Sequence, residues 1–306
     1  MLLNWLGALP GAAAQGIIWG IMAIGVYITY KILDVADLTV DGSICTGGAI
    51  CAVLVTTGVN VWLALLVATL AGILCGLVTG VFHTFMGIPA ILAGILTQLM
   101  LWSVNLKIMG KANVALPSRN FKVLVAASRV PNSLLVLAGF LVVLIALLYW
   151  FFGTEMGASL RATGSNLQMS RAQGINTEFN KILGLALSNG VVALSGALLT
   201  QYQGFADINM GRGAIVIGLA AVIIGEAVTA RFAKNFAVKL LGVILGGVIY
   251  YFVYQTVVFL GLDTDLLKML SALVVALFLG LPHLKATYFR GKKTPAVKND
   301  GGDANA

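Results

Sequence analysis

The sequence predicts an all-α fold, a polytopic bundle of transmembrane helices, from three observations. Of the 306 residues, 59% are hydrophobic and only 10% are charged, whereas soluble proteins carry about 25% charged residues. Apolar runs near the length of about 20 residues that a spanning helix needs recur along the chain. These runs are continuous and lack the alternation of barrel strands, so helices must satisfy the backbone in lipid.

About nine spans are expected, two of them short. The apolar runs cover residues 11–30, 44–58, 60–82, 88–108, 133–152, 182–202, 213–229, 240–260 and 265–282. The short runs, 44–58 and 213–229, each follow a polar segment that contains glycine. This pattern indicates discontinuous helices, which do not cross the membrane as simple spans.

The segments before the two short helices resemble each other. Residues 37–43 read DLTVDGS and residues 207–213 read DINMGRG. In each, an aspartate leads an aliphatic, a polar and an apolar residue, and glycine follows. We expect the first near the inside and the second near the outside of the membrane, as in the inverted repeats of transporters. Chance similarity is the competing interpretation of so short a match.

Small residues at four-residue spacing predict close helix packing. The glycines of these sets are Gly16 and Gly20, then Gly72, Gly76 and Gly80, then Gly242 and Gly246. This spacing places glycines on one helix face, where two backbones can approach closely.

Basic residues predict the orientation of the chain. They gather in segments 154–181 and 230–239 and in the tail after His283, which the positive-inside rule places in the cytoplasm with the C-terminus. The net charge of +8 therefore indicates orientation in a membrane and not nucleic-acid binding. We expect one transmembrane domain over residues 1–285 and a disordered basic cytoplasmic tail over 286–306.

Two features of the orientation stay open. The N-terminus lies outside if every run crosses the membrane, and inside if 44–58 enters and leaves on one side. The loop 110–132 is predicted to be external although it carries four basic residues, which the positive-inside rule does not explain.

A cytoplasmic segment, residues 154–181, carries signals for a short helix. Gly164 and Gly174 bracket residues 166–173, and Asn166 can cap their first turn, while Asn176 or Thr177 can cap the next span. A short helix held along the membrane surface would let a partner move the two adjoining spans. An ordinary amphipathic loop helix is the alternative interpretation.

The same segment resembles the permease family of ATP-binding cassette (ABC) importers for branched-chain amino acids, ribose and related solutes. The motifs are RATGxN at 161–166, AxGIN at 172–176, KIL at 181–183 and LSGA at 194–197, supported by DLTVDGS at 37–43, GIPAILAGIL at 87–96 and NLxIMG at 105–110. The resemblance implies a coupling helix that meets an ATPase. Its residues here are Arg161, Ala162, Gly164, Asn166, Arg171, Ala172 and Gly174.

The resemblance also implies partners. The sequence lacks a GxxxxGK[ST] phosphate-binding loop, so ATP hydrolysis is expected on separate ABC ATPase subunits and not on this transport subunit. An external solute-binding protein and a second permease copy are implied, in a bacterial inner membrane. A small solute such as an amino acid is expected. No cofactor or metal site is expected, and Cys45, Cys51 and Cys75 are interpreted as buried hydrophobic residues.

Polar residues at membrane depth are the candidates for a translocation pathway, because they are costly there without a function. They are Gln98, Asn105, Gln201, Tyr202, Asp207 and Glu226. For any one of them alone, a structural hydrogen bond between helices is the commoner role.

Two other functions compete with the importer permease. An ion-gradient-driven secondary transporter would use Asp37, Asp41 and Glu226 as ion or proton sites. A membrane-embedded enzyme is disfavoured, because no catalytic Ser/His/Asp set, HExxH motif or carboxylate pair stands out.

Overall fold

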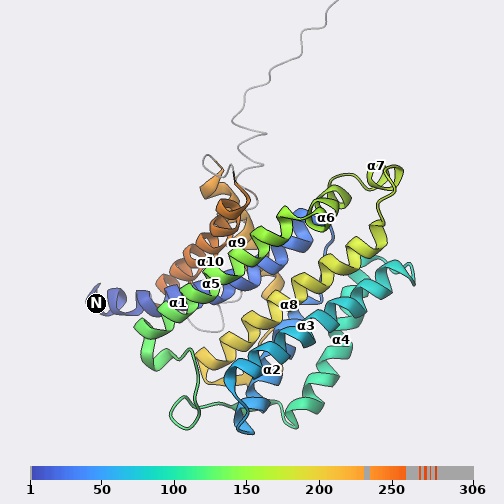
Figure 1. Ribbon diagram of the computed structural model, residues 1–306. Coiled ribbons are helices and arrows are strands. Elements are labelled where there is room, and N and C mark those ends of the chain that lie inside the picture. The colour runs from blue at the N-terminus through green and yellow to red at the C-terminus, as the bar shows by residue number, and fades with distance from the viewer. Residues whose placement is uncertain are drawn as a thin grey trace, which may run out of the picture.

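The computed structural model describes residues 2–230 and 235–259 and the isolated positions 269, 272, 273, 276 and 280. The chain forms a bundle of tilted helices (Figure 1). In order, the elements are α1 (Leu2–Tyr27), the π-helical turn η1 (Ile28–Ile32), α2 (Val40–Thr56), α3 (Val61–Thr84), α4 (Ala90–Met109), β1 (Asn113–Ala115), the 3-10 turn η2 (Ala127–Arg129), α5 (Val130–Gly153), α6 (Glu155–Ser165), α7 (Leu167–Ala172), α8 (Thr177–Gln203), β2 (Phe205–Asp207), α9 (Ala214–Thr229) and α10 (Phe236–Phe259).

The helices confirm the prediction of an all-α polytopic membrane bundle. Within the described residues, six helices are long and apolar enough to cross a membrane: α1 with η1, α3, α4, α5, α8 and α10. The two short runs form α2 and α9, of 17 and 16 residues, as predicted. The ninth predicted run, 265–282, and the tail 286–306 lie outside the described residues, apart from the isolated positions.

Two halves of the chain repeat the same order of elements. In each, a long helix leads through an aspartate-containing segment to a short helix and then to another long helix: α1, α2 and α3, then α8, α9 and α10. Asp37 Oδ1 accepts from the Thr39 amide at 2.9 Å, and Asp207 Oδ1 accepts from the Asn209 amide at 2.8 Å. The predicted similarity of the two segments therefore has a structural counterpart.

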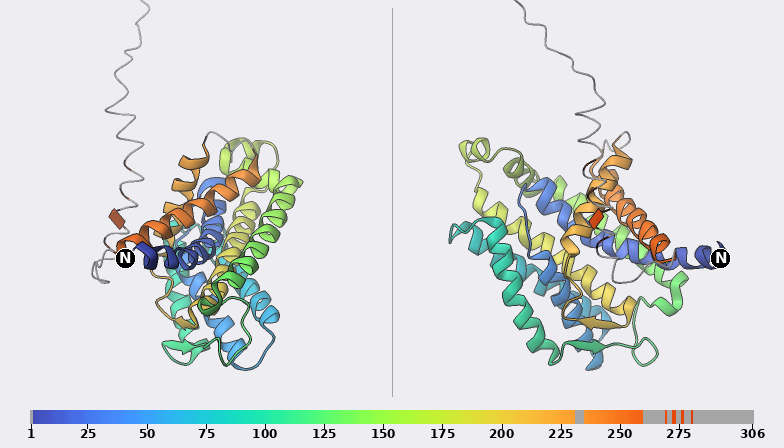
Figure 2. Two further views of the ribbon diagram at one scale, coloured as in Figure 1. Left: turned by 90° about the vertical axis from the view of Figure 1, so that its left-hand side faces the viewer. Right: turned by 180° about the vertical axis from the view of Figure 1, so that it is seen from behind.

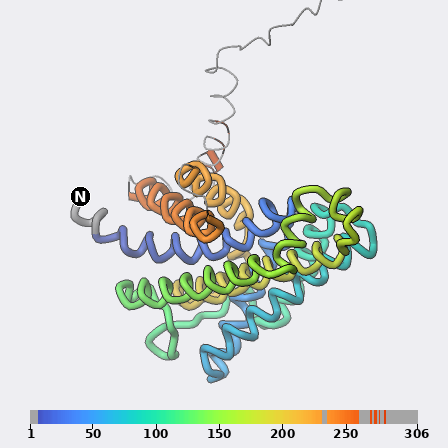
Figure 3. Tube along the Cα trace, turned by 45° about the horizontal axis from the view of Figure 1, so that its top comes forward, coloured from blue at the N-terminus to red at the C-terminus, as the bar shows by residue number. Residues whose placement is uncertain are grey.

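The two halves exchange their packing partners. Helix α1 packs against α9 and α10 of the other half, and α8 packs against α2 and α3. Figure 3 shows α1 between the α9–α10 pair and α5, and Figure 2 shows α4 and α10 at opposite edges of the bundle. Helices α1 and α8 run antiparallel, because Ser188 Oγ donates to the Gly25 carbonyl and Ser195 Oγ to the Ile18 carbonyl, each at 2.7 Å.

Glycines make this packing close. A Cβ on Gly16 would lie 2.6 Å from the Cα of Val248 on α10. Gly76 lies directly against the Leu185 carbonyl of α8, and Gly246 against the Ala221 carbonyl of α9. The spacing of the glycines therefore predicted real contact faces. The three cysteines are buried, as expected.

The sequence did not predict a small sheet that joins two connecting segments. Strands β1 and β2 pair antiparallel, with Asn113 opposite Asp207 and Ala115 opposite Phe205. Three-residue strands carry too short a pattern to be recognised from sequence. The sheet places the loop 110–132 at the end of the bundle opposite α7 (Figure 1). We call these ends the α7 end and the sheet end.

Candidate functional site

The predicted short helix of the 154–181 segment is present at the α7 end. Helix α7 spans Leu167–Ala172, and Asn166 Oδ1 accepts from the Met169 amide at 3.0 Å. Asn176 Oδ1 caps α8 in the same way, through the Phe179 amide at 3.0 Å. Both caps confirm the sequence-based prediction, because an asparagine at this position satisfies an amide that the first helical turn leaves free.

A second helix in this segment, α6, was not predicted, and contacts from other helices hold it. Asn180 of α8 donates from Nδ2 to Ser159 Oγ at 2.6 Å and to Thr163 Oγ1 at 2.8 Å. Gly164 lies so close to the carbonyl of Ile32, at the end of η1, that no side chain fits there. Helix α6 is therefore fixed to α8 and to the end of the first span.

The residues that the resemblance assigned to coupling fall into three groups. Arg161 and Arg171 bind within the segment and its neighbours: the Arg161 guanidinium donates to the Phe152 carbonyl of α5 at 2.9 Å, and Arg171 Nε donates to Thr177 Oγ1 at 3.1 Å. Ala162 and Gly164 are half-buried, whereas Asn166, Ala172 and Gly174 are exposed. Met169, for which the sequence predicts no role, is 59% exposed on α7.

A second region lies where α2 and α9 begin. Asp41, in the first turn of α2, accepts from the amides of Gly213 and Ile215, each at 2.9 Å. The two segments that precede these helices, which the inverted-repeat interpretation expects near opposite faces of the membrane, lead into this one junction. Each starts at its own end of the bundle, next to α6 or β2, and runs inward until the short helices meet.

Buried polar groups brace this junction. Asn189 of α8 donates from Nδ2 to Asp37 Oδ2 at 2.7 Å and accepts from Ser43 Oγ at 2.6 Å. Both carboxylate oxygens of Asp37 are therefore engaged, one by Asn189 and the other by Thr39. A buried polar group without such partners would be costly.

The six candidate pathway residues occupy different surroundings. Gln201 accepts from the Leu124 amide, the Tyr202 hydroxyl donates to the Gly11 carbonyl, Asp207 closes its own turn, and Glu226 forms an ion pair with Lys31 at 3.0 Å. These four have structural partners. Gln98 and Asn105 line a common cavity, which they share with Asp41 at the junction of α2 and α9.

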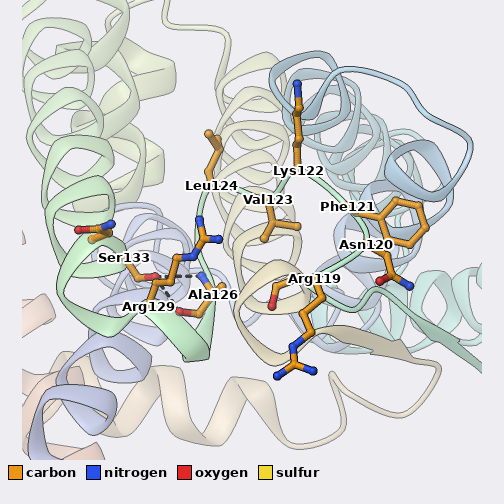
Figure 4. A pocket seen from close by; sticks show the side chains of 11 residues that line it. Arg119, Asn120, Phe121, Lys122, Val123, Leu124, Ala126, Arg129 and Ser133 are labelled. Atoms are coloured by element: carbon orange, nitrogen blue, oxygen red, sulfur yellow. Dashed lines mark hydrogen bonds between the residues drawn. The ribbon is translucent and has the colours of Figure 1, made fainter.

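A basic pocket lies at the sheet end, in the loop 110–132. Arg119, Lys122 and Arg129 surround a cavity of about 400 Å³ (Figure 4). Ser133 of α5 fixes its wall through hydrogen bonds to both the amide and the carbonyl of Ala126, at 2.9 and 2.8 Å. Three of the four basic residues that depart from the positive-inside rule therefore line one concave surface.

Comparison with known proteins decides the family. The sequence matches the family described as the permease component of branched-chain amino acid transport systems over residues 9–279. This chain belongs to that permease family. It is a multi-pass membrane protein of the transport class, and the resemblance noted in the sequence is confirmed.

Individual relatives of this permease come from several bacteria. It is 42% identical to a tyrosine transport system permease protein of Clostridioides difficile (strain R20291), over 92% of each chain. It is 34% identical to an uncharacterised protein of Rickettsia prowazekii (strain Madrid E), over 90% of this chain and 96% of the relative. It is 32% identical to the autoinducer 2 import system permease protein LsrC of Salmonella choleraesuis, over 61% of this chain and 54% of the relative. No solved structure matches the sequence.

Proposed function

We propose that this chain is the membrane-spanning subunit of an ATP-driven importer for a small solute such as an amino acid. Family membership supports a role in import, and the relative named as a tyrosine permease supports an amino acid. The observation that carries the coupling role is α7, a short capped helix that projects from the bundle and is tied to the spans on both sides.

The contacts of this segment give a path for mechanical coupling. A force on α7 reaches α8 through the Arg171–Thr177 hydrogen bond, and reaches α6 through the single residue that joins the two helices. Helix α6 is itself bound to α8 through Asn180. Because α8 braces the junction of the short helices through Asn189, a partner that moves α7 would act on the centre of the bundle.

The exposed side chains of the α7 end suit a protein partner. Met156, Met169 and Phe179 are 46%, 59% and 52% exposed, on α6, α7 and the start of α8. Apolar side chains grouped with polar ones typify an interaction surface. We propose that separate ABC ATPase subunits bind here and that Arg161, Ala162, Gly164, Asn166, Arg171, Ala172 and Gly174 build and present this surface.

The remaining parts of the importer follow from this assignment. The α7 end and the C-terminus lie in the cytoplasm of a bacterial cell, and the sheet end faces outward. An external solute-binding protein delivers the solute there, and a second permease copy completes the pathway. Residues 1–285 form the transmembrane domain, and 286–306 form a basic cytoplasmic tail.

Co-purification with the native neighbours tests the proposal. The full chain carries a C-terminal tag, and native mass spectrometry reports which subunits stay bound. We expect an ATPase to remain with the unmodified chain and to be lost from Met169→Asp. The matched control is Phe205→Asp, which places the same charge on an exposed apolar position of β2 at the sheet end and keeps the ATPase.

One result would reject the importer assignment in favour of the secondary transporter. It is a stable particle without ATPase that moves solute into liposomes along an ion gradient.

A further inference from the structure

A small cavity lies beside the junction of α2 and α9, between α2, α4 and the segment that precedes α9. Its volume is about 190 Å³, below the roughly 300–1,000 Å³ of pockets for drug-sized ligands, so it suits only a small solute. Asp41, Gln98, Trp102, Asn105 and Arg212 line it. The residues of α4 that line it run from Gln98, near the middle of the helix, to Asn105, four residues before its end at Met109, so the cavity lies between the middle of the bundle and the sheet end.

Asn105 carries an unsatisfied polar atom in this cavity. Its side chain is 1% exposed, and Oδ1 is the one buried side-chain oxygen or nitrogen without a hydrogen-bond partner among the described residues. Its Nδ2 lies 3.5 Å from the Gly42 carbonyl oxygen, and the one thiol hydrogen of Cys45, on the same cavity wall, has the carbonyls of Ile208 and Asp207 as acceptors, at 3.4 and 3.6 Å. Such an acceptor is costly to bury, and a ligand donor would satisfy it.

The cavity is also lined by two oppositely charged residues, Asp41 and Arg212, that form no ion pair with each other. In the described part of the chain, Arg212 makes no ion pair and no side-chain hydrogen bond, although Asp41 lines the same cavity. The Asp41 carboxylate accepts the amides of Gly213 and Ile215, one on each oxygen, and a carboxylate has about four acceptor positions in all. Arg212, which can donate hydrogen bonds to an anionic group, and Asp41, which can accept them from a cationic group, therefore line the same small cavity.

We propose that this cavity binds a zwitterionic α-amino acid during transport, an inference that rests on the proposed import function. Arg212 takes the carboxylate through a charge-assisted hydrogen bond. Asp41 and Asn105 Oδ1 take the ammonium group. The indole of Trp102, which is 44% exposed, lies against the side chain of the amino acid.

Binding of labelled solutes to the full chain in lipid nanodiscs tests this site. The probes are L-tyrosine, L-leucine, tyramine, which lacks the carboxylate, and 3-(4-hydroxyphenyl)propionate, which lacks the amine. We expect Arg212→Met to weaken L-tyrosine at least tenfold and to leave tyramine unchanged. We expect Asn105→Leu to weaken L-tyrosine and tyramine and to leave the propionate unchanged. Arg119→Met, which removes an arginine from the basic pocket at the sheet end, is the control and changes none of them.

Three results would overturn the inference: no amino-acid binding by the unmodified chain at millimolar concentration, unchanged L-tyrosine binding in Arg212→Met, or equal losses for L-tyrosine and tyramine in that variant. ATPase retention by the unmodified chain separates this failure from failure of the import function. A chain that keeps its ATPase but binds no amino acid loses only the cavity assignment.

Discussion

Replacing Asn180 with alanine should loosen α6 from the bundle without unfolding it. The side chain is buried and gives two hydrogen bonds to α6, at 2.6 and 2.8 Å. With a net contribution of about 1 kcal/mol each, their loss lowers the free energy of local opening by about 2 kcal/mol. Every 1.4 kcal/mol is a factor of ten, so the open population rises about 30-fold.

Hydrogen–deuterium exchange measures this opening directly, because backbone amides exchange through local unfolding. Amides of residues 157–172 should exchange about 30-fold faster in Asn180→Ala, while those in the middle of α8 keep their rates. ATP-driven uptake should fall as the segment disengages. Asn132→Ala, an exposed asparagine on α5 at the sheet end, should change neither quantity. Unchanged exchange over 157–172 would show that Asn180 does not hold α6.

Three further substitutions have expected outcomes. Gly76→Val drives a side chain into an α8 carbonyl and should lower stability by about 1–3 kcal/mol, seen as a lower thermal midpoint in detergent; Gly139→Val, with open space around it, should not. Asp41→Ala removes the acceptor for two amides at the start of α9, those of Gly213 and Ile215, and should cost about 1–2 kcal/mol in the same assay. Glu226→Gln breaks a partly exposed pair with Lys31 and should cost about 1 kcal/mol or less; a loss of uptake with unchanged stability would instead assign Glu226 to the pathway.

Local signals in the sequence were sufficient to predict most of the helices. Each predicted run within the described residues corresponds to a helix, because length and hydropathy alone decide what a bilayer accommodates. The starts of α7 and α8 were also predictable, since Asn166 and Asn176 accept hydrogen bonds from amides only three residues away.

Features that depend on distant contacts were not predictable. Helix α6 contains glycines that disfavour helix, and Asn180 and the end of η1 stabilise it from elsewhere in the chain. Polarity at membrane depth identified Gln201 and Tyr202, but their partners lie 77 and 191 residues away. Arg212 was read only as part of a short repeat, because its place in a cavity depends on where α4 packs.

The exchange of packing partners between the two halves has a consequence for biogenesis. The ribosome delivers α1 to the membrane long before α10, yet the glycine face of α1 is built for α10. Until α10 is inserted, the glycine face of α1 lacks the helix against which it packs. The glycine face of α3 likewise lacks its partner until α8 is inserted. Final packing of α1 is therefore late: a chain arrested before α10 can already pair α3 with α8, but it leaves α1 and α9 without their α10 contacts.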